Sequence, residues 1–389
     1  MAVDRKKFRT CDQTSFCRRH RNHKPISRYT VTNIRQLQQN ERVHYDEYVK
    51  GPTASVMADL VAHSNGDVKH GFGRSNLVLN LYFLESGVSR IRITPNYHDP
   101  EIVSRVRPTY DAEVLNVEEM VGASDVKEVP CSDWMKAMVS PHSEDSCTVF
   151  QYAGDRFGLM LLSEPFMEIH LFDLETQQQL MSVNSDSLLY FEQGQDFKVM
   201  NDQDVDIQRK LTVEEDGESN DDRHGGKKIV GYWEDGLAIY EDGSREEKRV
   251  EIEDTFLNGN EYTDGMFEEK FQEHVDSKPF GPASVGVDIV FPNSSHLYGL
   301  PEHASSTQLK TTLGDGAEYK EPYRLYNLDV FEYELDETMA LYGAIPLIVS
   351  HTAKSTVGAF WFNPTETFVD VVDLNDSANS GTNGMKSTW

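Results

Sequence analysis

The feature that most constrains the fold of this chain is a succession of short strand patterns separated by turn residues. Residues 77–83 (LVLNLYF) form an almost continuous apolar run, Ser86 and Gly87 offer a turn, and residues 89–93 alternate polar and apolar side chains. This arrangement predicts a β-hairpin. Further strands are expected at residues 158–162, 166–172, 187–192, 285–291, 344–349, 358–362 and 367–372.

Helical signals are weak by comparison. The sequence has no long amphipathic helix pattern and no alternation of strands with helices, and residues 36–50 are the best candidate for a short helix. Short strands separated by Gly, Pro, Asn and Asp are typical of an antiparallel sandwich. We therefore expect an all-β fold built as an antiparallel β-sandwich.

Charge divides the chain into regions. Residues 1–54 form a basic N-terminal arm, which is either solvated or ordered on an otherwise acidic body. Residues 202–223 hold nine acidic and three basic residues with almost no large apolar side chains, so residues 201–254 are expected to be an acidic, disordered insertion. The insertion divides the predicted sandwich into residues 55–200 and 255–374, and residues 375–389 are expected to be a linker or frayed tail.

The net charge of -28 limits the partners that the protein can have. Like-charge repulsion disfavours a nucleic-acid backbone or an anionic membrane surface, whereas a neutral ligand such as a sugar is compatible. No apolar run approaches the roughly 18 residues that span a bilayer. The polar, basic start carries no visible signal peptide, which by itself indicates a cytosolic protein or a processed start.

Four cysteines, Cys11, Cys17, Cys131 and Cys147, form two close pairs. They are compatible with two short-loop disulfides or with four free thiols, and spacing alone does not decide between these. No histidine lies near either pair at the spacing of a zinc site, so we expect no metal. Two N-glycosylation sequons, at Asn293 and Asn375, are weak support for a secretory route.

Catalytic signatures are missing from the sequence. There is no G-x-S-x-G elbow, no phosphate-binding G-x-x-x-x-G-K-[ST] loop and no H-E-x-x-H zinc motif. Acidic residues are abundant, but none stands in a setting that identifies it as a nucleophile. The residues alone therefore indicate a β-sandwich binding module.

Three stretches add a resemblance to a known family. Residues 9–19 read RTCDQTSFCRR, residues 276–282 and 297–304 read DSKPFGP and LYGLPEHA, and residues 322–331 read PYRLYNLDVF, followed by MALYG at 339–343 and FWFN at 360–363. Together they resemble glycoside hydrolase family 31, and within it the glucosidase II branch. Residues 100–150 and the acidic insertion match poorly.

The resemblance implies a fold and different roles for two domains. In this family, the N-terminal domain is a galactose-mutarotase-like β-sandwich that packs on a (β/α)8 barrel, and the barrel carries the catalytic aspartates. The family nucleophile lies in a Trp-x-Asp-Met-Asn-Glu-like motif that is absent here. We therefore expect this chain to be an N-terminal segment of a retaining α-glucosidase, inactive alone, with no cofactor and with an exposed apolar face where the barrel packs.

The resemblance also implies site residues. Asp329 matches an aspartate that binds the sugar in the −1 subsite from a loop of the sandwich, and Phe331 could stack on a sugar face. Glu302, His303 and Tyr326 are expected to support the loop, and Cys11 and Cys17 are expected to be joined. Ordinary alternatives are an Asx-turn or a cap in a loop for Asp329 and packing for Phe331.

The implied context is processing of glucose-containing N-glycans in the endoplasmic-reticulum lumen, with a lectin-like β subunit as a possible partner. The competing hypotheses are a free-standing, noncatalytic β-sandwich that binds carbohydrate or protein, and a truncated gene product. A downstream reading frame that encodes the barrel would distinguish the first hypothesis from the other two.

Overall fold

The computed structural model describes eleven segments of the 389-residue chain. These segments are residues 9–22, 29–37, 55–62, 76–95, 122–139, 146–192, 229–232, 238–240, 268–277, 284–375 and 383–389. All strand pairs in them are antiparallel. The expected antiparallel all-β class is therefore confirmed.

The helical elements are short. They are the 3-10 turn η2 (Cys11–Gln13), α1 (Ser15–Asn22) and α5 (Asp133–Lys136). The strands are β1 (Tyr29–Gln36), β2 (Val56–Ala62), β3 (Leu77–Phe83), β4 (Ser89–Pro95), β5 (Lys127–Val129), β6 (Cys147–Tyr152), β7 (Phe157–Leu162), β8 (Glu168–Asp173), β9 (Gln178–Val183), β10 (Tyr190–Glu192), β11 (Ile229–Tyr232), β12 (Ala238–Tyr240), β13 (Glu268–Phe271), β14 (His274–Ser277), β15 (Ser284–Gly286), β16 (Asp288–Pro292), β17 (Leu297–Gly299), β18 (Tyr323–Leu325), β19 (Leu347–His351), β20 (Thr356–Phe360), β21 (Thr367–Asp373) and β22 (Gly384–Thr388).

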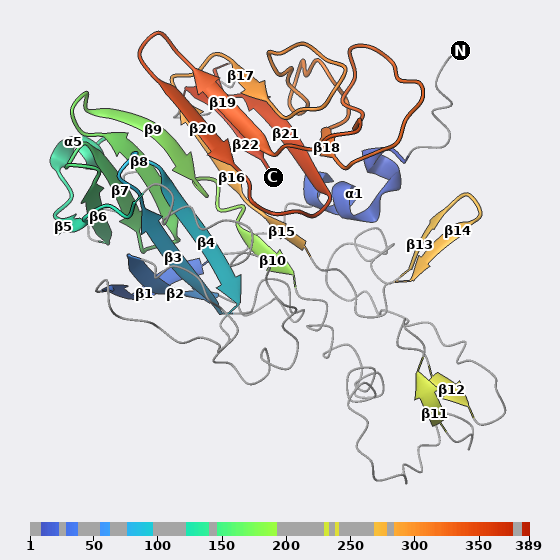
Figure 1. Ribbon diagram of the computed structural model, residues 1–389, viewed down its shortest axis with the longest axis horizontal. Coiled ribbons are helices and arrows are strands. Elements are labelled where there is room, and N and C mark those ends of the chain that lie inside the picture. Colours follow the sequence, from blue (N-terminus) through green and yellow to red (C-terminus); the bar gives the residue numbers. More distant parts are fainter. Residues whose placement is uncertain are drawn as a thin grey trace.

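A nine-stranded sheet forms the centre of the molecule, in the order β18-β21-β22-β16-β9-β8-β7-β6-β5 (Figure 1). Strands from the two halves of the chain meet in it, because β16 pairs with β9 at Ile289 and Val183. The sheet is therefore continuous across the long segment that separates β9 from β16 in the sequence.

Both faces of the central sheet are buried near β7. Successive side chains of a strand point to opposite faces. Leu159 and Leu161 accordingly join the main core, while Met160 and Leu162 join a smaller core beneath α5, which contributes Met135. The continuous apolar run of β7 thus reflects burial on both sides.

The four-stranded sheet β1-β2-β3-β4 covers one face of the central sheet and completes the sandwich. Phe83 of β3 meets Tyr152 of β6 with ring centroids 4.8 Å apart, and the Tyr152 hydroxyl donates to the Gly87 carbonyl at 3.1 Å. The predicted hairpin is β3–β4, with Leu77 opposite Pro95 and Phe83 opposite Ser89.

A smaller sheet, β17-β19-β20, carries the segment that is relevant to function. The chain leaves β17 at Gly299, passes through β18 in the central sheet and returns to β19 at Leu347. The long connection between β18 and β19 contains Asp329. The two sheets therefore hold its ends.

The prediction for the C-terminal tail is wrong. Residues 375–389 were expected to be a linker or frayed end, but β22 lies inside the central sheet between β21 and β16. Its polar sequence gave no strand signal, because its stability comes from backbone bonds to both neighbours. Trp389 is also buried, stacks on Trp361 and donates to the Ser387 hydroxyl at 3.0 Å.

Two further boundaries differ from expectation. The sandwich begins before residue 55, because β1 within the basic arm pairs with β2. β1 ends at Gln36, where the helix candidate at residues 36–50 was predicted to begin. Most of that candidate lies outside the described residues. The strand expected at 285–291 is two strands. They are separated at Val287, whose N–H and carbonyl both pair with Trp389.

The acidic stretch at residues 202–223 lies outside the described residues. Within residues 201–254, the structure describes one hairpin, β11–β12, and β13–β14 form another hairpin after it.

Candidate functional site

The connection between β18 and β19, residues 326–346, is here named the Asp329 loop. Its two limbs are tied together: the Leu328 N–H donates to the Leu341 carbonyl at 2.7 Å, and the Tyr342 hydroxyl donates to the Val330 carbonyl. The tied residues flank Asp329 directly on both sides. The main chain at Asp329 is therefore fixed by its neighbours.

The Asp329 side chain lies at the surface of the molecule. Val330 is buried at 6% exposure, whereas Asp329 is exposed. Among the described residues, the Asp329 carboxylate makes no hydrogen bond or ion pair with the protein, so the Asx-turn alternative finds no support. A carboxylate held in this way can accept hydrogen bonds from two hydroxyl groups of a ligand.

Phe331 is the most exposed large hydrophobic residue of the described segments, at 93%. Ordinary packing does not account for its position. Nine of the twelve exposed large hydrophobic side chains in these segments lie between residues 326 and 362, and we name this set the apolar face. Its members are Tyr326, Phe331, Tyr333, Leu335, Tyr342, Ile345, Leu347, Phe360 and Phe362.

Glu302 bonds to the end of the Asp329 loop. Its backbone N–H donates to the Gly343 carbonyl, and its carboxylate accepts from the Gly343 N–H, both at 2.9 Å. A Cβ atom at Gly343 would lie 3.1 Å from the Glu302 carboxyl carbon. The pair therefore requires glycine or a shift of the glutamate side chain.

His303 bridges the segment after β17 to β18. Its Nδ1 lies 2.5 Å from the Leu300 carbonyl oxygen and its Nε2 lies 2.9 Å from that of Arg324. A neutral imidazole can donate to only one of these oxygens, whereas the protonated ring can donate to both. Burial lowers the pKa of His303, and the two carbonyl contacts oppose that shift without reversing it.

Tyr326 starts the loop and covers a charged side chain. The Arg324 guanidinium lies 4.9 Å from the Tyr326 ring centroid and 5.8 Å from that of Phe368, and its Nε donates to Glu366 at 2.7 Å. Glu302, His303 and Tyr326 thus all contact segments that hold the loop. Their role as loop support, like that of Asp329 and Phe331 in sugar binding, stays a prediction.

Asp336 is an anchor that the sequence did not reveal. Its carboxylate accepts from Lys310 at 2.6 and 2.8 Å and from the Tyr319 hydroxyl at 2.6 Å. The Lys310 bond, with the Tyr319 bond, lowers the pKa of Asp336. Lys310 and Tyr319 lie in the chain before β18. Nothing in the local pattern distinguishes Asp336 from the many other acidic residues.

An open cavity of about 470 Å³ lies beside this anchor. It is lined by His303, Ala304, Ser305, Ser306, Tyr333, Leu335, Asp336 and Leu341. Asp329 and Phe331 are not part of the lining.

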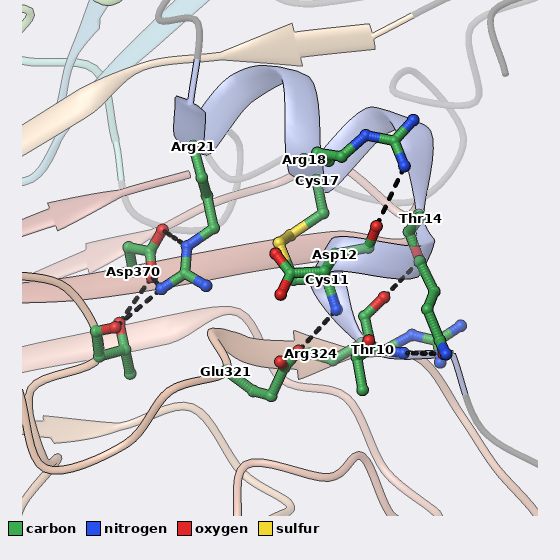
Figure 2. Close-up of a disulfide and its surroundings, with 12 residues drawn as sticks. Thr10, Cys11, Asp12, Thr14, Cys17, Arg18, Arg21, Glu321, Arg324 and Asp370 are labelled. Carbon is green, nitrogen blue, oxygen red and sulfur yellow. Dashed lines mark hydrogen bonds and ion pairs between the residues drawn. A yellow bond between two sulfur atoms is a disulfide. The ribbon is translucent and has the colours of Figure 1, made fainter. Parts of the chain in front are cut away.

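The N-terminal residues 9–22, here named the N-terminal clip, dock on the chain that leads into β18 (Figure 2). Cys11 and Cys17 are joined, with Cα atoms 5.1 Å apart, and the Cys11 N–H donates to Glu321 at 2.6 Å. The ordered alternative for the basic arm holds for this segment. A second disulfide joins Cys131 and Cys147 beside α5.

Arg21 makes four hydrogen bonds between the clip and the rest of the domain. Its Nε and Nη2 donate to the two carboxylate oxygens of Asp370, both at 3.0 Å, and further bonds reach the carbonyls of Lys320 and Thr312. Figure 2 shows Arg21 directed at Asp370 from the end of α1. The charges are compensated although the two side chains are only 15% and 10% exposed.

The described segments also bear on metal binding and on membrane insertion. Within the described segments, no group of His, Cys, Asp or Glu could hold a metal ion. In the same part of the chain, every helix is too short or too polar to cross a bilayer.

Comparison with known proteins gives the geometry a context. A family model described as the glycosyl hydrolase 31 N-terminal galactose mutarotase-like domain matches residues 78–370. Neutral alpha-glucosidase AB of Mus musculus is 34% identical over 378 residues, which are 95% of this chain and 31% of that protein. The chain therefore spans about a third of the length of this curated relative.

Solved structures share the fold. The α3-Glc2-bound glucosidase II alpha subunit aligns with a TM-score of 0.61 and 23% identity, over 98% of this chain and 34% of that one. A heterodimeric complex of ER glucosidase II, containing the catalytic subunit and the binding domain of the regulatory subunit, aligns with a TM-score of 0.58 and 22% identity, over 98% and 34% of the two chains. At these identities the likeness shows the fold alone.

Proposed function

Because the chain belongs to the glycosyl hydrolase 31 N-terminal galactose mutarotase-like domain family, we propose that it completes the sugar site of a retaining α-glucosidase whose catalytic barrel follows it. The matched residues 78–370 include Asp329 and all of its anchors except the N-terminal clip. The chain corresponds to the N-terminal segment of glucosidase II-like enzymes, and the activity of the whole protein is part of the proposal.

The Asp329 loop is the observation that supports this proposal. A fixed main chain that presents an unpaired carboxylate can orient a sugar ring through two hydroxyl groups before the chemical step. The neighbouring exposed Phe331 ring offers an apolar surface for a sugar face. Cleavage of a glycosidic bond with retention of configuration needs a pair of carboxyl groups about 5 Å apart. In the proposal, the barrel supplies this pair.

The apolar face supports the proposed partner. A concentration of exposed large hydrophobic side chains in one stretch of the chain favours a surface that another protein surface covers. Phe331, Leu335 and Phe360 are all more than half exposed, and they lie on or near the same loop as Asp329. We infer that the barrel covers this face and that the Asp329 carboxylate then borders its mouth.

The relatives support the proposed substrate and location. One aligned structure holds an α3-linked glucose disaccharide, and another is a complex with a regulatory subunit. By analogy, our proposal includes trimming of glucose from N-glycans, a lectin-like β subunit as partner and the endoplasmic-reticulum lumen as the compartment. The two disulfides are compatible with an oxidising lumen.

Hydrolysis of p-nitrophenyl α-glucoside tests the proposal. The whole protein, with chain and barrel together, should hydrolyse this substrate and release glucose first as the α-anomer, which NMR detects. The 389-residue chain alone should give no turnover. Turnover by the chain alone would show that it contains a carboxylate pair, and an inactive or inverting whole protein would contradict the assignment.

A further inference from the structure

The structure treats the two N-glycosylation sequons differently. Asn293 follows β16 in the turn that leads to β17 and has a positive φ of 58°, a conformation that asparagine tolerates better than most residues. Its side chain is exposed and makes no hydrogen bond among the described residues. Only its backbone N–H is engaged, donating to the Asn383 carbonyl at 3.0 Å.

Asn375 uses its side chain in the fold. Its Nδ2 donates to the Asp373 carboxylate at 2.8 Å and lies 3.4 Å from the carbonyl oxygens of Ser294 and Gly384. An N-linked sugar replaces one of the two hydrogens on this nitrogen. A sugar at Asn375 would therefore compete with native contacts, whereas a sugar at Asn293 displaces no side-chain hydrogen bond to the residues that the structure describes.

The surroundings of Asn293 suit a bulky polar group. Leu297 pairs with Ser350 and Gly299 pairs with Ile348, so Asn293 precedes the Leu297 end of β17, whereas the Asp329 loop rejoins the sheet beside the Gly299 end. The Ser350 hydroxyl donates to the Ser294 hydroxyl at 2.9 Å, which places the turn beside the polar end of β19. Among the described residues, no exposed large hydrophobic lies at 284–325 or 348–359.

From these observations we propose that Asn293 is an acceptor for an N-linked oligosaccharide. The donor is a lipid-diphosphate-linked oligosaccharide. The Asn293 Nδ2 forms a bond to the sugar C1, the C1–O bond to the diphosphate breaks, the lipid diphosphate departs with the bonding electrons, and the amide loses one proton. The exposed Ser295 provides the hydroxyl that the sequon requires.

This inference rests on the lumenal location in the proposed function, so its test separates the two. The 389-residue chain is directed into the lumen of a eukaryotic secretory cell by an added signal peptide. The purified chain is digested, and the Asn293 peptide is measured by mass spectrometry before and after peptide N-glycosidase in heavy-oxygen water. A glycan at Asn293 leaves a heavy-labelled aspartate. An Asn293 peptide recovered only in unmodified form overturns the inference, whatever the native compartment.

Three variants control the result. Ser295→Ala removes the acceptor signal without changing the positive-φ residue, so the chain should stay folded and migrate faster on a gel by one glycan. Ser295→Thr keeps the hydroxyl and should keep the glycan. Asn375→Gln should leave the Asn293 glycopeptide unchanged. An unaltered glycopeptide in Ser295→Ala would overturn the assignment to this sequon.

Discussion

The N-terminal clip and the Asp329 loop each involve one aspartate, but the two carboxylates have opposite environments. Asp370 is buried at 8% exposure and accepts from Arg21 and from the Thr312 hydroxyl. Asp329 is exposed and has no partner in the described segments, although the main chain around it is tied. One carboxylate holds the fold together, and the other is available to a ligand.

The two regions are connected through the chain before β18. The clip bonds to Thr312, Lys320 and Glu321, while Asp336 of the loop bonds to Lys310 and Tyr319 of the same segment. Residues 310–321 therefore receive anchors from both regions. The groups that stabilise this part of the molecule are therefore distinct from the group that is free to bind.

The largest stability effect is expected at Arg21. Arg21→Met leaves the buried Asp370 without its cation, and removing one partner of a buried pair costs about 4 kcal/mol. Urea unfolding of the 389-residue chain measures this loss. Arg18→Met is the matched control, because Arg18 lies on the same helix and donates to the exposed Asp12 carbonyl. A loss below 1 kcal/mol at Arg21 would remove the distinction between the two aspartates.

A third aspartate, Asp288, is buried and makes the stability of the fold depend on pH. Burial raises the pKa of Asp288 to about 6, although the N–H groups of Asp186 and Leu188 bond to its carboxylate. The folded state therefore binds a proton more tightly than the unfolded state. The stability that Asp288 gains from binding this proton is fully present below pH 3.8, the pKa of the unfolded state. It is lost as the pH rises through about 6, the pKa of the folded state.

We expect wild type to lose roughly 3 kcal/mol relative to Asp288→Asn between these limits, because each pKa unit corresponds to about 1.4 kcal/mol. Urea unfolding at a series of pH values measures the difference. Parallel profiles for the two proteins would contradict the raised pKa of Asp288.

The disulfide of the clip should have a smaller effect. Replacing Cys11 and Cys17 with serine opens a short loop, for which chain entropy predicts a loss of about 2 kcal/mol. Thermal unfolding of the double variant measures the loss, and hydrogen exchange should rise at residues 310–321. Unchanged exchange there would show that the clip does not brace this segment.

The smallest stability effect is expected at Phe331. Its side chain is 93% exposed, so Phe331→Ala should change the free energy of unfolding by less than about 0.5 kcal/mol. In the whole protein, the same change should raise KM for a glucose disaccharide. A large loss of stability would place the ring in packing rather than in ligand binding.

The sequence predicted the strands that bury apolar side chains. The run LVLNLYF gives β3 its observed ends, because every residue of the strand is buried. It could not predict β22, whose sequence GMKST is polar and is held by pairing with β21 and β16. Side-chain periodicity does not report such backbone pairing.

Part of the candidate site was predicted, but from the family resemblance and not from the pattern of side chains. The resemblance identified Asp329, and composition or spacing would not have done so. Its exposure depends on the bond between Leu328 and Leu341 and on the contact of Tyr342 with Val330. The Arg21–Asp370 pair joins residues 349 positions apart. No local pattern carries information over that distance.

The central claim is that Asp329 binds sugar without stabilising the fold. The direct measurement compares kcat/KM and the free energy of unfolding for Asp329→Ala in the whole protein, with the exposed Asp315→Ala as control. The account predicts a kcat/KM lower by roughly 100-fold, the value of hydrogen bonds to a charged group, with unfolding unchanged. An unchanged kcat/KM, or a decrease that is matched by lost stability, would contradict it.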